Sequence, residues 1–403
     1  MSGSDYLPRH LDERLVASLA AAPVVILDGP RGVGKTTTAR RVAASAVMLP
    51  RDLPALEVDP ERYLLGLEAP VLIDEWQLAG TDLLWTVKGI VDRDPSPGRF
   101  LLTGSVEPAT YGPTYPLTGR AVQLVMRPMT RAELEGRGDQ KTFLSRILAS
   151  GSGKWTPAAA GAAFDITELT VPGFPAARRM PDPGLFLDAY AGSVSQRAGD
   201  EGRDASRLLR TMRVLATLEG QAVPDQRIWD AADINKVTWK AYEDLLTRTY
   251  LTAPLPAYET NHLKRLTAYP KRFLADTALA LALARVGADD LVADPSLAGA
   301  YLESFVLQQL RPQADLAGVD LSHLRTTAGT HEVDLVVEID ERIIGLEVKH
   351  APRPTASAAR PLAWLRDQLG DRFSQGYVVH TGQEAYALGE RIWAVPVGDL
   401  LGA

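Results

Sequence analysis

The sequence predicts an α/β protein that contains a parallel-sheet domain, a helical middle and a second α/β domain. Three observations support this prediction. A glycine-rich motif at residues 29–36 stands between an apolar run and a helical pattern. Apolar residues recur at helical spacing between residues 206 and 251. Apolar and polar residues then alternate in two neighbouring runs between residues 333 and 349, as they do in half-buried strands.

Composition narrows the class of protein. The chain has 403 residues, enough for two or three domains. Its formal net charge of −7 excludes a basic surface over the whole protein but is compatible with a local one. It lacks cysteine, which excludes disulfides, thiolate zinc sites and cysteine nucleophiles. No apolar run approaches the roughly 20 residues of a membrane helix, and residues 1–12 do not resemble a signal peptide. We expect a cytoplasmic protein without a membrane partner.

The motif Gly29–Thr36 fits the P-loop pattern G-x-x-x-x-G-K-[ST] at every fixed position. It follows a strand expected at Val24–Leu27 and precedes a helix expected at Thr37–Ala44. In this setting backbone N–H groups point at phosphates, and the helix end adds about half a positive charge. The alternative is a glycine-rich turn without a ligand.

Each part of this motif has an expected role. The glycines let the backbone pass close to the ligand without a Cβ in the way. Lys35 would reach the β- and γ-phosphates, and the Thr36 hydroxyl would ligate magnesium. The residues expected to hold the nucleotide are Gly29, Pro30, Arg31, Gly32, Val33, Gly34, Lys35, Thr36 and Thr37.

A second apolar strand, Val71–Ile73, ends in the acidic residues Asp74 and Glu75. Acidic residues at the carboxyl end of such a strand lie beside the P-loop in a parallel α/β sheet. Asp74 would hold magnesium, and Glu75 would polarise the attacking water. The alternative is a strand that ends in a solvated acidic pair.

A third strand, Phe100–Leu102, is followed by Thr103 and Ser105. Thr103 is the first candidate for a residue that senses the γ-phosphate, and Ser105 is the second. A plain strand exit is the alternative. Arg120 precedes a strand-like run and is a candidate arginine finger, supplied by the same or a neighbouring subunit. An ordinary surface arginine is the alternative.

This ordered set of motifs, followed by Pro128-Met129, resembles the prokaryotic AAA+ ATPases that carry a C-terminal domain of unknown function numbered 4143. The resemblance spans most of the chain. It implies ATP and Mg²⁺ as cofactors, and it is compatible with a homo-oligomer. We expect the ATPase domain at residues 1–136 and a helical subdomain with a linker at residues 137–200.

The middle of the chain predicts three helices followed by a short extended run, an order typical of a winged helix at residues 201–258. The third helix would present polar residues to a DNA major groove, namely Lys236, Thr238 and Lys240. The alternative is a helical packing module with solvated lysines. DNA is the partner that we expect.

The two alternating runs near the carboxyl end predict a strand pair in which Leu335 lies opposite Leu346, so that Asp334 lies opposite Glu347. Residues directly opposite each other in a strand pair have Cβ atoms about 5 Å apart. Two carboxylates at about that distance repel by about 3 kcal/mol at an effective dielectric near 20. A divalent cation such as Mg²⁺ would relieve the repulsion. Lys349 would lie on the same face and orient or deprotonate a water.

These residues resemble the PD-(D/E)xK nuclease core, which places the domain at residues 259–403. The resemblance implies a second metal site made of Glu303, Asp334 and Glu347 with Lys349. It also fits a helix near residues 362–368 and a strand at residues 376–380. The alternative is a degenerate nuclease fold used only for binding or packing.

Two smaller expectations concern this region. Arg325 either touches a phosphate or forms a buried ion pair, and Asp276 caps the helix that follows it.

Two functions therefore stay open. In the first, Mg²⁺-dependent ATP hydrolysis drives DNA binding and cleavage. In the second, ATP switches a binding protein whose nuclease-like fold is inert.

Overall fold

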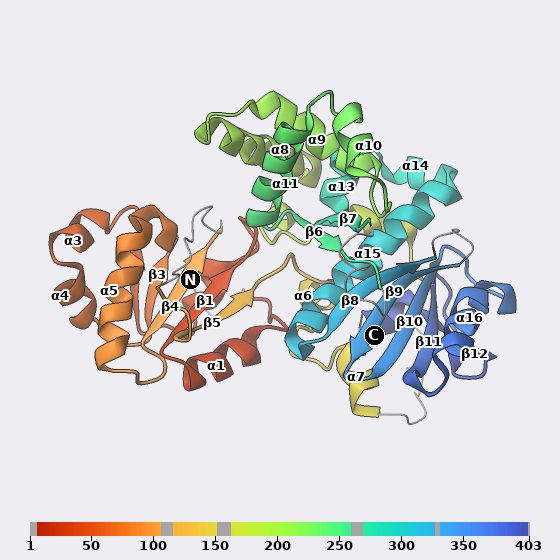
Figure 1. Cartoon of the computed structure of the whole chain (residues 1–403), viewed down its shortest axis with the longest axis horizontal. Coiled ribbons are helices and arrows are strands. Elements are labelled where there is room, and N and C mark those ends of the chain that lie inside the picture. The colour runs from red at the N-terminus through yellow and green to blue at the C-terminus, as the bar shows by residue number, and fades with distance from the viewer. Residues whose placement is uncertain (1–5, 106–115, 151–162, 259–268, 327–330, 402–403) are drawn as a thin grey trace. The chain divides into compact units, whose positions relative to one another are not determined.

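The computed structural model describes residues 6–105, 116–150, 163–258, 269–326 and 331–401 (Figure 1). The chain forms two compact units. The first, called the P-loop unit, comprises residues 9–128 and 246–251. The second, called the C-terminal unit, comprises residues 1–8, 129–245 and 252–403. The domain boundaries expected within the C-terminal unit stay predictions.

The P-loop unit is built on a five-stranded sheet with the strand order β2-β3-β4-β1-β5. All neighbouring strands are parallel. Their bounds are β1 Val24–Asp28, β2 Ser45–Met48, β3 Val71–Asp74, β4 Phe100–Gly104 and β5 Ala121–Val125. β1, β3 and β4 are buried along their whole length, which is why they appear in the sequence as unbroken apolar runs.

The helices of this unit cover the sheet. Their bounds are α1 Asp12–Ala21, α2 Lys35–Ala39, α3 Leu53–Val58, α4 Pro60–Leu65, η1 Trp76–Ala79 and α5 Gly80–Arg93. Leu84 and Val87 on α5 pack into a core with residues of β1, β3 and β4. This helix is long and amphipathic, so its buried stripe is visible in the sequence.

The edge strand β2 has no counterpart in the sequence-based predictions, and the helix expected at Thr37–Ala44 ends at Ala39. Of the four residues of β2 only Val47 is fully buried, so no apolar pattern marks the strand. Its register is set instead by a distant partner, because the backbone N–H of Ala44 donates to the carbonyl of Pro70 just ahead of β3.

The C-terminal unit begins with helices that lead into a short hairpin. Their bounds are α6 Arg131–Leu134, α7 Phe143–Ser150, η2 Ile166–Thr170, η3 Ala177–Arg179, α8 Pro183–Asp200, α9 Ala205–Thr217, α10 Asp225–Ala231 and α11 Lys236–Arg248. β6 Thr252–Leu255 and β7 Lys271–Leu274 then pair antiparallel. The order of three helices α9–α11 and a strand follows the sequence-based expectation.

A six-stranded mixed sheet forms the rest of this unit, in the order β12-β13-β11-β10-β9-β8. Its strands are β8 Asp320–Arg325, β9 Glu332–Ile339, β10 Arg342–Lys349, β11 Phe373–His380, β12 Tyr386–Gly389 and β13 Ile392–Pro396. The other elements are α13 Thr277–Ala284, α14 Ala288–Ala293, α15 Pro295–Ala317, η4 Ala356–Ala359, α16 Arg360–Leu369, η5 Gly370–Arg372 and α17 Val397–Leu400. The sheet lies between α15 and α16 (Figure 1), and α16 approaches so closely that a Cβ on Gly345 would lie 2.7 Å from Leu362 Cδ2.

The predicted register of β9 and β10 is confirmed for the residues of the two strands that pair. Val337 lies opposite Ile344, and Leu335 lies opposite Leu346. Beyond that pair the Asp334 carboxylate accepts a hydrogen bond of 2.8 Å from the backbone N–H of Val348.

The long helix α15 fastens the C-terminal unit through its polar side chains. Gln309 accepts from the backbone N–H of Arg131, and Gln313 accepts from that of Leu144. Ser304 donates to the buried carboxylate of Glu219. These bonds stabilise segments that lie far apart in the sequence.

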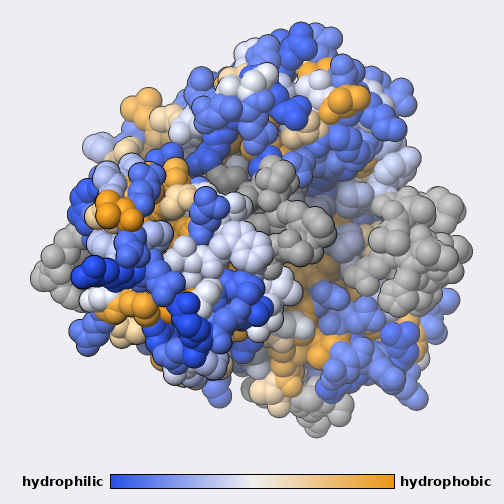
Figure 2. All heavy atoms as spheres, turned by 60° about the vertical axis from the view of Figure 1, so that its left-hand side comes forward, coloured by the Kyte–Doolittle hydropathy of each residue, from blue (hydrophilic) through white to orange (hydrophobic). Residues whose placement is uncertain are grey.

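No helix in the described part of the chain is long and apolar enough to cross a membrane. In Figure 2 hydrophilic side chains cover most of the visible face, and the apolar ones form small separate groups.

Asp276 caps α13 as expected, and it does more than that. Its Oδ1 accepts from Leu279 N–H at 2.9 Å, and its Oδ2 accepts from Gly173 N–H at 2.7 Å and from Gln308 Nε2 at 3.1 Å. The side chain is fully buried.

We predict that Asp276→Ala lowers the free energy of unfolding by roughly 3 kcal/mol, because it leaves buried donors without an acceptor. Urea denaturation of the full chain measures the effect. Asp294→Ala is the matched control, since Asp294 caps α15 from an exposed position and its loss should cost only about 1 kcal/mol. Equal losses in the two variants would contradict the prediction.

Candidate functional site

The P-loop follows β1 at the carboxyl edge of the parallel sheet, and α2 begins at Lys35. Gly29, Gly32 and Gly34 have φ angles of 147°, 82° and 103°. A Cβ on Gly29 would lie 2.1 Å from the carbonyl oxygen of Met126. Only glycine therefore allows the loop to pack against the segment that follows β5.

Lys35 is 5% exposed, and its ammonium donates to the carbonyls of Gly29 and Pro30, both at 2.8 Å. The positive charge is thus held at the loop itself. The helix α2 has only five residues, so its dipole is small, and the loop amides and Lys35 must supply most of the attraction for a phosphate.

One carboxylate oxygen joins three segments of the site, namely β3, β4 and α2. Asp74 Oδ1 accepts from Thr36 Oγ1 at 2.8 Å and from Thr103 Oγ1 at 2.5 Å. Asp74 and Thr103 are almost fully buried and lie opposite each other in the pairing of β3 with β4. A hydroxyl and a carboxylate in contact are suitable ligands for Mg²⁺, so these residues fit the expected ion.

Glu75 follows Asp74 in a left-handed conformation with φ of 55°. This conformation is strained for a residue with a Cβ, and it aims the side chain away from the strand direction. Glu75 Oε2 accepts from Ser105 Oγ at 2.9 Å and from Gln77 Nε2 at 2.5 Å. Ser105 therefore contacts Glu75, and Thr103 links both acids, since its Oγ1 also accepts from Glu75 N–H at 3.3 Å.

Arg120 lies away from this site within its own chain. It precedes β5, whose first residue pairs with Val24 at the start of β1, whereas the P-loop follows the end of β1. Its guanidinium donates to the Asp92 carboxylate, which holds the pKa of Asp92 down at about 2. A role in a neighbouring subunit stays a prediction.

Arg9 belongs to the site although the sequence offers no signal for it. It is 5% exposed and donates to the carbonyl of Val33 at 2.8 Å and to that of Arg127 at 2.7 Å. It therefore ties the P-loop to the segment after β5. Gln77 is the other residue that sequence reasoning missed, and its position two residues after Glu75 is the only signal.

Two of the acids expected at the second metal site, Glu303 and Asp334, surround a lysine together with Glu332, which the sequence analysis did not single out. Lys271 Nζ lies 2.8 Å from Glu303 Oε1, 3.0 Å from Glu332 Oε1 and 3.6 Å from Asp334 Oδ1. These four residues are called the acid cluster below. Burial by itself lowers the pKa of Lys271, but the three carboxylates outweigh it and raise that pKa above the ordinary value.

The described contacts of the acid cluster are those of an ammonium group. Among the residues that the structure describes, no three His, Asp or Glu side chains are arranged to hold a metal ion. In the structure the Lys271 ammonium lies where the sequence analysis expects Mg²⁺ to relieve the repulsion at Asp334, and the expected Mg²⁺ site stays a prediction. Lys271 lies in a short strand, and nothing in its local sequence shows which acids it meets.

Glu347 and Lys349 lie next to this cluster on β10. Lys349 Nζ contacts Glu347 Oε1 at 2.5 Å, while Glu347 Oε2 is buried and has no hydrogen-bond partner among the described residues. Burial, and then the charge of Asp334, raise the pKa of Glu347 and that of Glu303 to about 8.

The lysines expected to meet DNA are partly engaged within the protein. Lys240 Nζ lies 2.7 Å from Asp225 and 2.8 Å from Glu243, and Arg272 contacts the same two carboxylates. The charge of Lys240 is thus neutralised. Arg325 lies opposite Glu332 in the pairing of β8 with β9, an arrangement that suits the ion-pair alternative.

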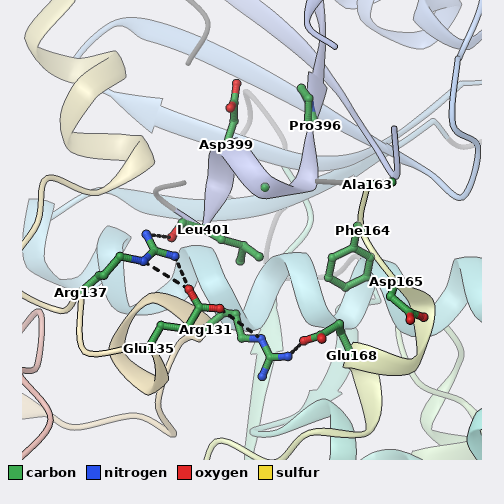
Figure 3. Close-up of a pocket in the computed structure, with 11 residues that line it drawn as sticks. Arg131, Glu135, Arg137, Ala163, Phe164, Asp165, Glu168, Pro396, Asp399 and Leu401 are labelled. Atoms are coloured by element: carbon green, nitrogen blue, oxygen red, sulfur yellow. Dashed lines mark hydrogen bonds and ion pairs between the residues drawn. The ribbon is translucent and has the colours of Figure 1, made fainter. Parts of the chain in front are cut away.

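Within the C-terminal unit, a hollow of about 230 Å³ lies between the segment around α6 and residues 396–401 (Figure 3). Its arginines are neutralised by carboxylates: Arg131 by Glu168, and Arg137 by Glu135 at 2.5 Å. Arg137 also donates to the carbonyl of Leu401 at 3.0 Å. Because its arginines are paired with carboxylates, the hollow offers little charge to an anion.

Three family profiles match the chain: an AAA domain at residues 21–135, a domain of unknown function (DUF8612) at residues 184–290, and another (DUF4143) at residues 298–400. The uncharacterized proteins Rv2008c of Mycobacterium tuberculosis and Mb2031c of Mycobacterium bovis are each 30% identical to it over 408 residues. The alignment covers 98% of this chain and 84% of either relative.

Solved structures resemble the chain more distantly. The Walker-type ATPase PABY2304 of Pyrococcus abyssi is 16% identical in sequence, and its TM-score is 0.42. The superposition covers 70% of this chain and 97% of that ATPase. A second structure, a STAND protein with a tetratricopeptide repeat sensor from Pyrococcus horikoshii, is 11% identical and has a TM-score of 0.24. The superposition covers 79% of this chain and 50% of that protein.

The raised pKa of Glu347 predicts how stability depends on pH. The folded chain binds this proton more tightly than the unfolded chain, so stability falls as pH rises from about 5 through 8, by up to about 1.4 kcal/mol per pH unit for one such group. Glu347→Gln should leave stability at pH 5 nearly unchanged and make the decline shallower. Urea denaturation between pH 5 and pH 9 measures both slopes, and equal slopes would count against the prediction.

Proposed function

The chain belongs to the same family as the uncharacterized mycobacterial proteins, and because it matches an AAA domain and DUF4143 we propose that it hydrolyses ATP with Mg²⁺. The observation that carries the proposal is the sharing of Asp74 Oδ1 by Thr36 and Thr103 beside the P-loop. It brings the expected metal ligands into contact and places Glu75 next to them.

The P-loop residues bind and orient the triphosphate. The loop's backbone N–H groups, which Pro30 lacks, would face the phosphates, and the Lys35 ammonium would exchange its present bonds to loop carbonyls for phosphate oxygens. Thr36 and Asp74 would hold Mg²⁺, which when bound neutralises charge that develops on the phosphate oxygens. Arg9 keeps the loop in place through the carbonyl of Val33.

Glu75 acts as the residue that orients and polarises the attacking water. Its strained backbone and its bonds from Ser105 and Gln77 hold the carboxylate in one position, which supports this role. Thr103 couples the two acids, because it donates to Asp74 and accepts from the backbone of Glu75. Arg120 would complete such a site only from a neighbouring subunit of a homo-oligomer.

Two roles stay open for the C-terminal unit, and the acid cluster favours one of them. Cleavage of DNA would require a divalent cation at Asp334 and Glu347, where the cluster instead has an ammonium. This supports an ATP-switched binding protein whose nuclease-like fold does not cut. The helices α9–α11 and the strands β6–β7, in winged-helix-like order, are our candidate for DNA contact.

We predict that Glu75→Gln lowers the rate of ATP hydrolysis by about 100-fold or more while ATP binding persists, because the neutral amide cannot polarise water. Lys35→Ala should weaken ATP binding as well. Hydrolysis is measured by phosphate release, and binding by calorimetry. Glu57→Gln, an exposed carboxylate on α3, is the control.

Normal turnover by the Glu75→Gln variant would remove Glu75 from the mechanism. Normal turnover by both variants would remove the P-loop from it.

We also predict that supercoiled plasmid stays intact with the native chain in Mg²⁺ or Mn²⁺. Gel electrophoresis after incubation checks this. Cleavage that disappears in Asp334→Asn would reverse our preference between the two roles, whereas cleavage unaffected by that change indicates contamination.

A further inference from the structure

Two consecutive residues of β7 serve two different parts of the C-terminal unit. Lys271 meets the carboxylates of Glu303, Glu332 and Asp334, whereas Arg272 meets Asp225 and Glu243 on the helical side. Successive side chains of a strand point to opposite faces, so this division follows from the strand itself. β7 therefore joins α10 and α11 to the mixed sheet through charge.

The distances within the acid cluster suit an ammonium group. Charge-assisted N–H···O bonds have lengths near 2.8 Å, and Lys271 has one such contact to Glu303 and one of 3.0 Å to Glu332. Mg²⁺ requires oxygens at about 2.0–2.1 Å. The carboxylates would have to close in by roughly 0.7 Å or more before they could ligate that ion.

Burial favours a cation at this point. The Lys271 side chain is 3% exposed, and those of Asp334 and Glu303 are 13% and 16% exposed. Carboxylates so far from water are costly unless a positive charge compensates them. Glu347 Oε2, buried on the neighbouring strand without a hydrogen-bond partner among the described residues, is an unused acceptor next to the cluster.

We propose that Lys271 is the resident cation of the acid cluster and takes the position of a divalent metal, so that the native chain binds no Mg²⁺ or Mn²⁺ there. The cation comes from outside the DUF4143 match, since Lys271 lies within the DUF8612 match and the acids lie within residues 298–400. The C-terminal sheet thus depends on a neighbouring module for its charge balance. Removal of the ammonium uncovers a latent metal site made of Glu303, Asp334 and Glu347.

Titration of the full chain with Mn²⁺ tests this, with free Mn²⁺ followed by electron paramagnetic resonance. All variants carry Asp74→Asn and no nucleotide is added, so that the P-loop does not contribute a site. We expect no binding at the acid cluster of this parent up to millimolar Mn²⁺. Lys271→Ala should bind one Mn²⁺ at least tenfold more tightly than the parent, and addition of Asp334→Asn should abolish the gain.

Lys271→Arg is the matched control, because it keeps the positive charge and should bind no Mn²⁺. Circular dichroism checks the fold of each variant, and Lys271→Gln replaces Lys271→Ala if the latter does not fold. Binding by the parent that Asp334→Asn removes would overturn the proposal. A folded Lys271→Ala or Lys271→Gln variant without any gain would overturn it as well, and if neither folds the parent titration decides.

Discussion

The P-loop unit depends on one carboxylate. Asp74 lies at the end of a buried strand. Its Oδ1 accepts hydrogen bonds from the hydroxyl groups of Thr36 on α2 and Thr103 on β4. Hydrogen bonds to an ionised group are about twice as strong as neutral ones, and burial strengthens them further. Because three segments converge on this atom, the glycine loop, the acid pair and the polar strand exit form one site.

The two units satisfy the same constraint in different ways. Buried carboxylates need a positive charge close by. In the P-loop unit Asp74 has only hydroxyl partners among the contacts described above, so the arrangement suits an ion that arrives with a nucleotide. In the C-terminal unit Lys271 supplies the charge permanently. Similar acidic residues on strands can therefore belong to two kinds of site. In one kind a ligand brings the positive charge, and in the other a lysine of the same chain supplies it.

Local pattern predicted much of this structure. The P-loop, the strands around Asp74 and Thr103, the register of Leu335 with Leu346, and the cap at Asp276 all follow from residues close together in the sequence. The missed features depend on distant partners. β2 is defined by its pairing with β3, Arg9 by the carbonyls that it reaches, and Lys271 by acids at least 32 positions away. The spacing of apolar residues along the sequence carries no information about such distant contacts, which is why the sequence analysis did not place Lys271 beside Asp334.

The helix α15 has a consequence for how this chain can evolve. Its polar side chains reach Arg131, Leu144 and Glu219, so their angular positions around the helix axis are matched to partners in different segments. One added or deleted residue would rotate everything beyond it by about 100° and misalign these side chains together. A point replacement along α15 therefore disturbs one contact, whereas a change in its length disturbs several at once.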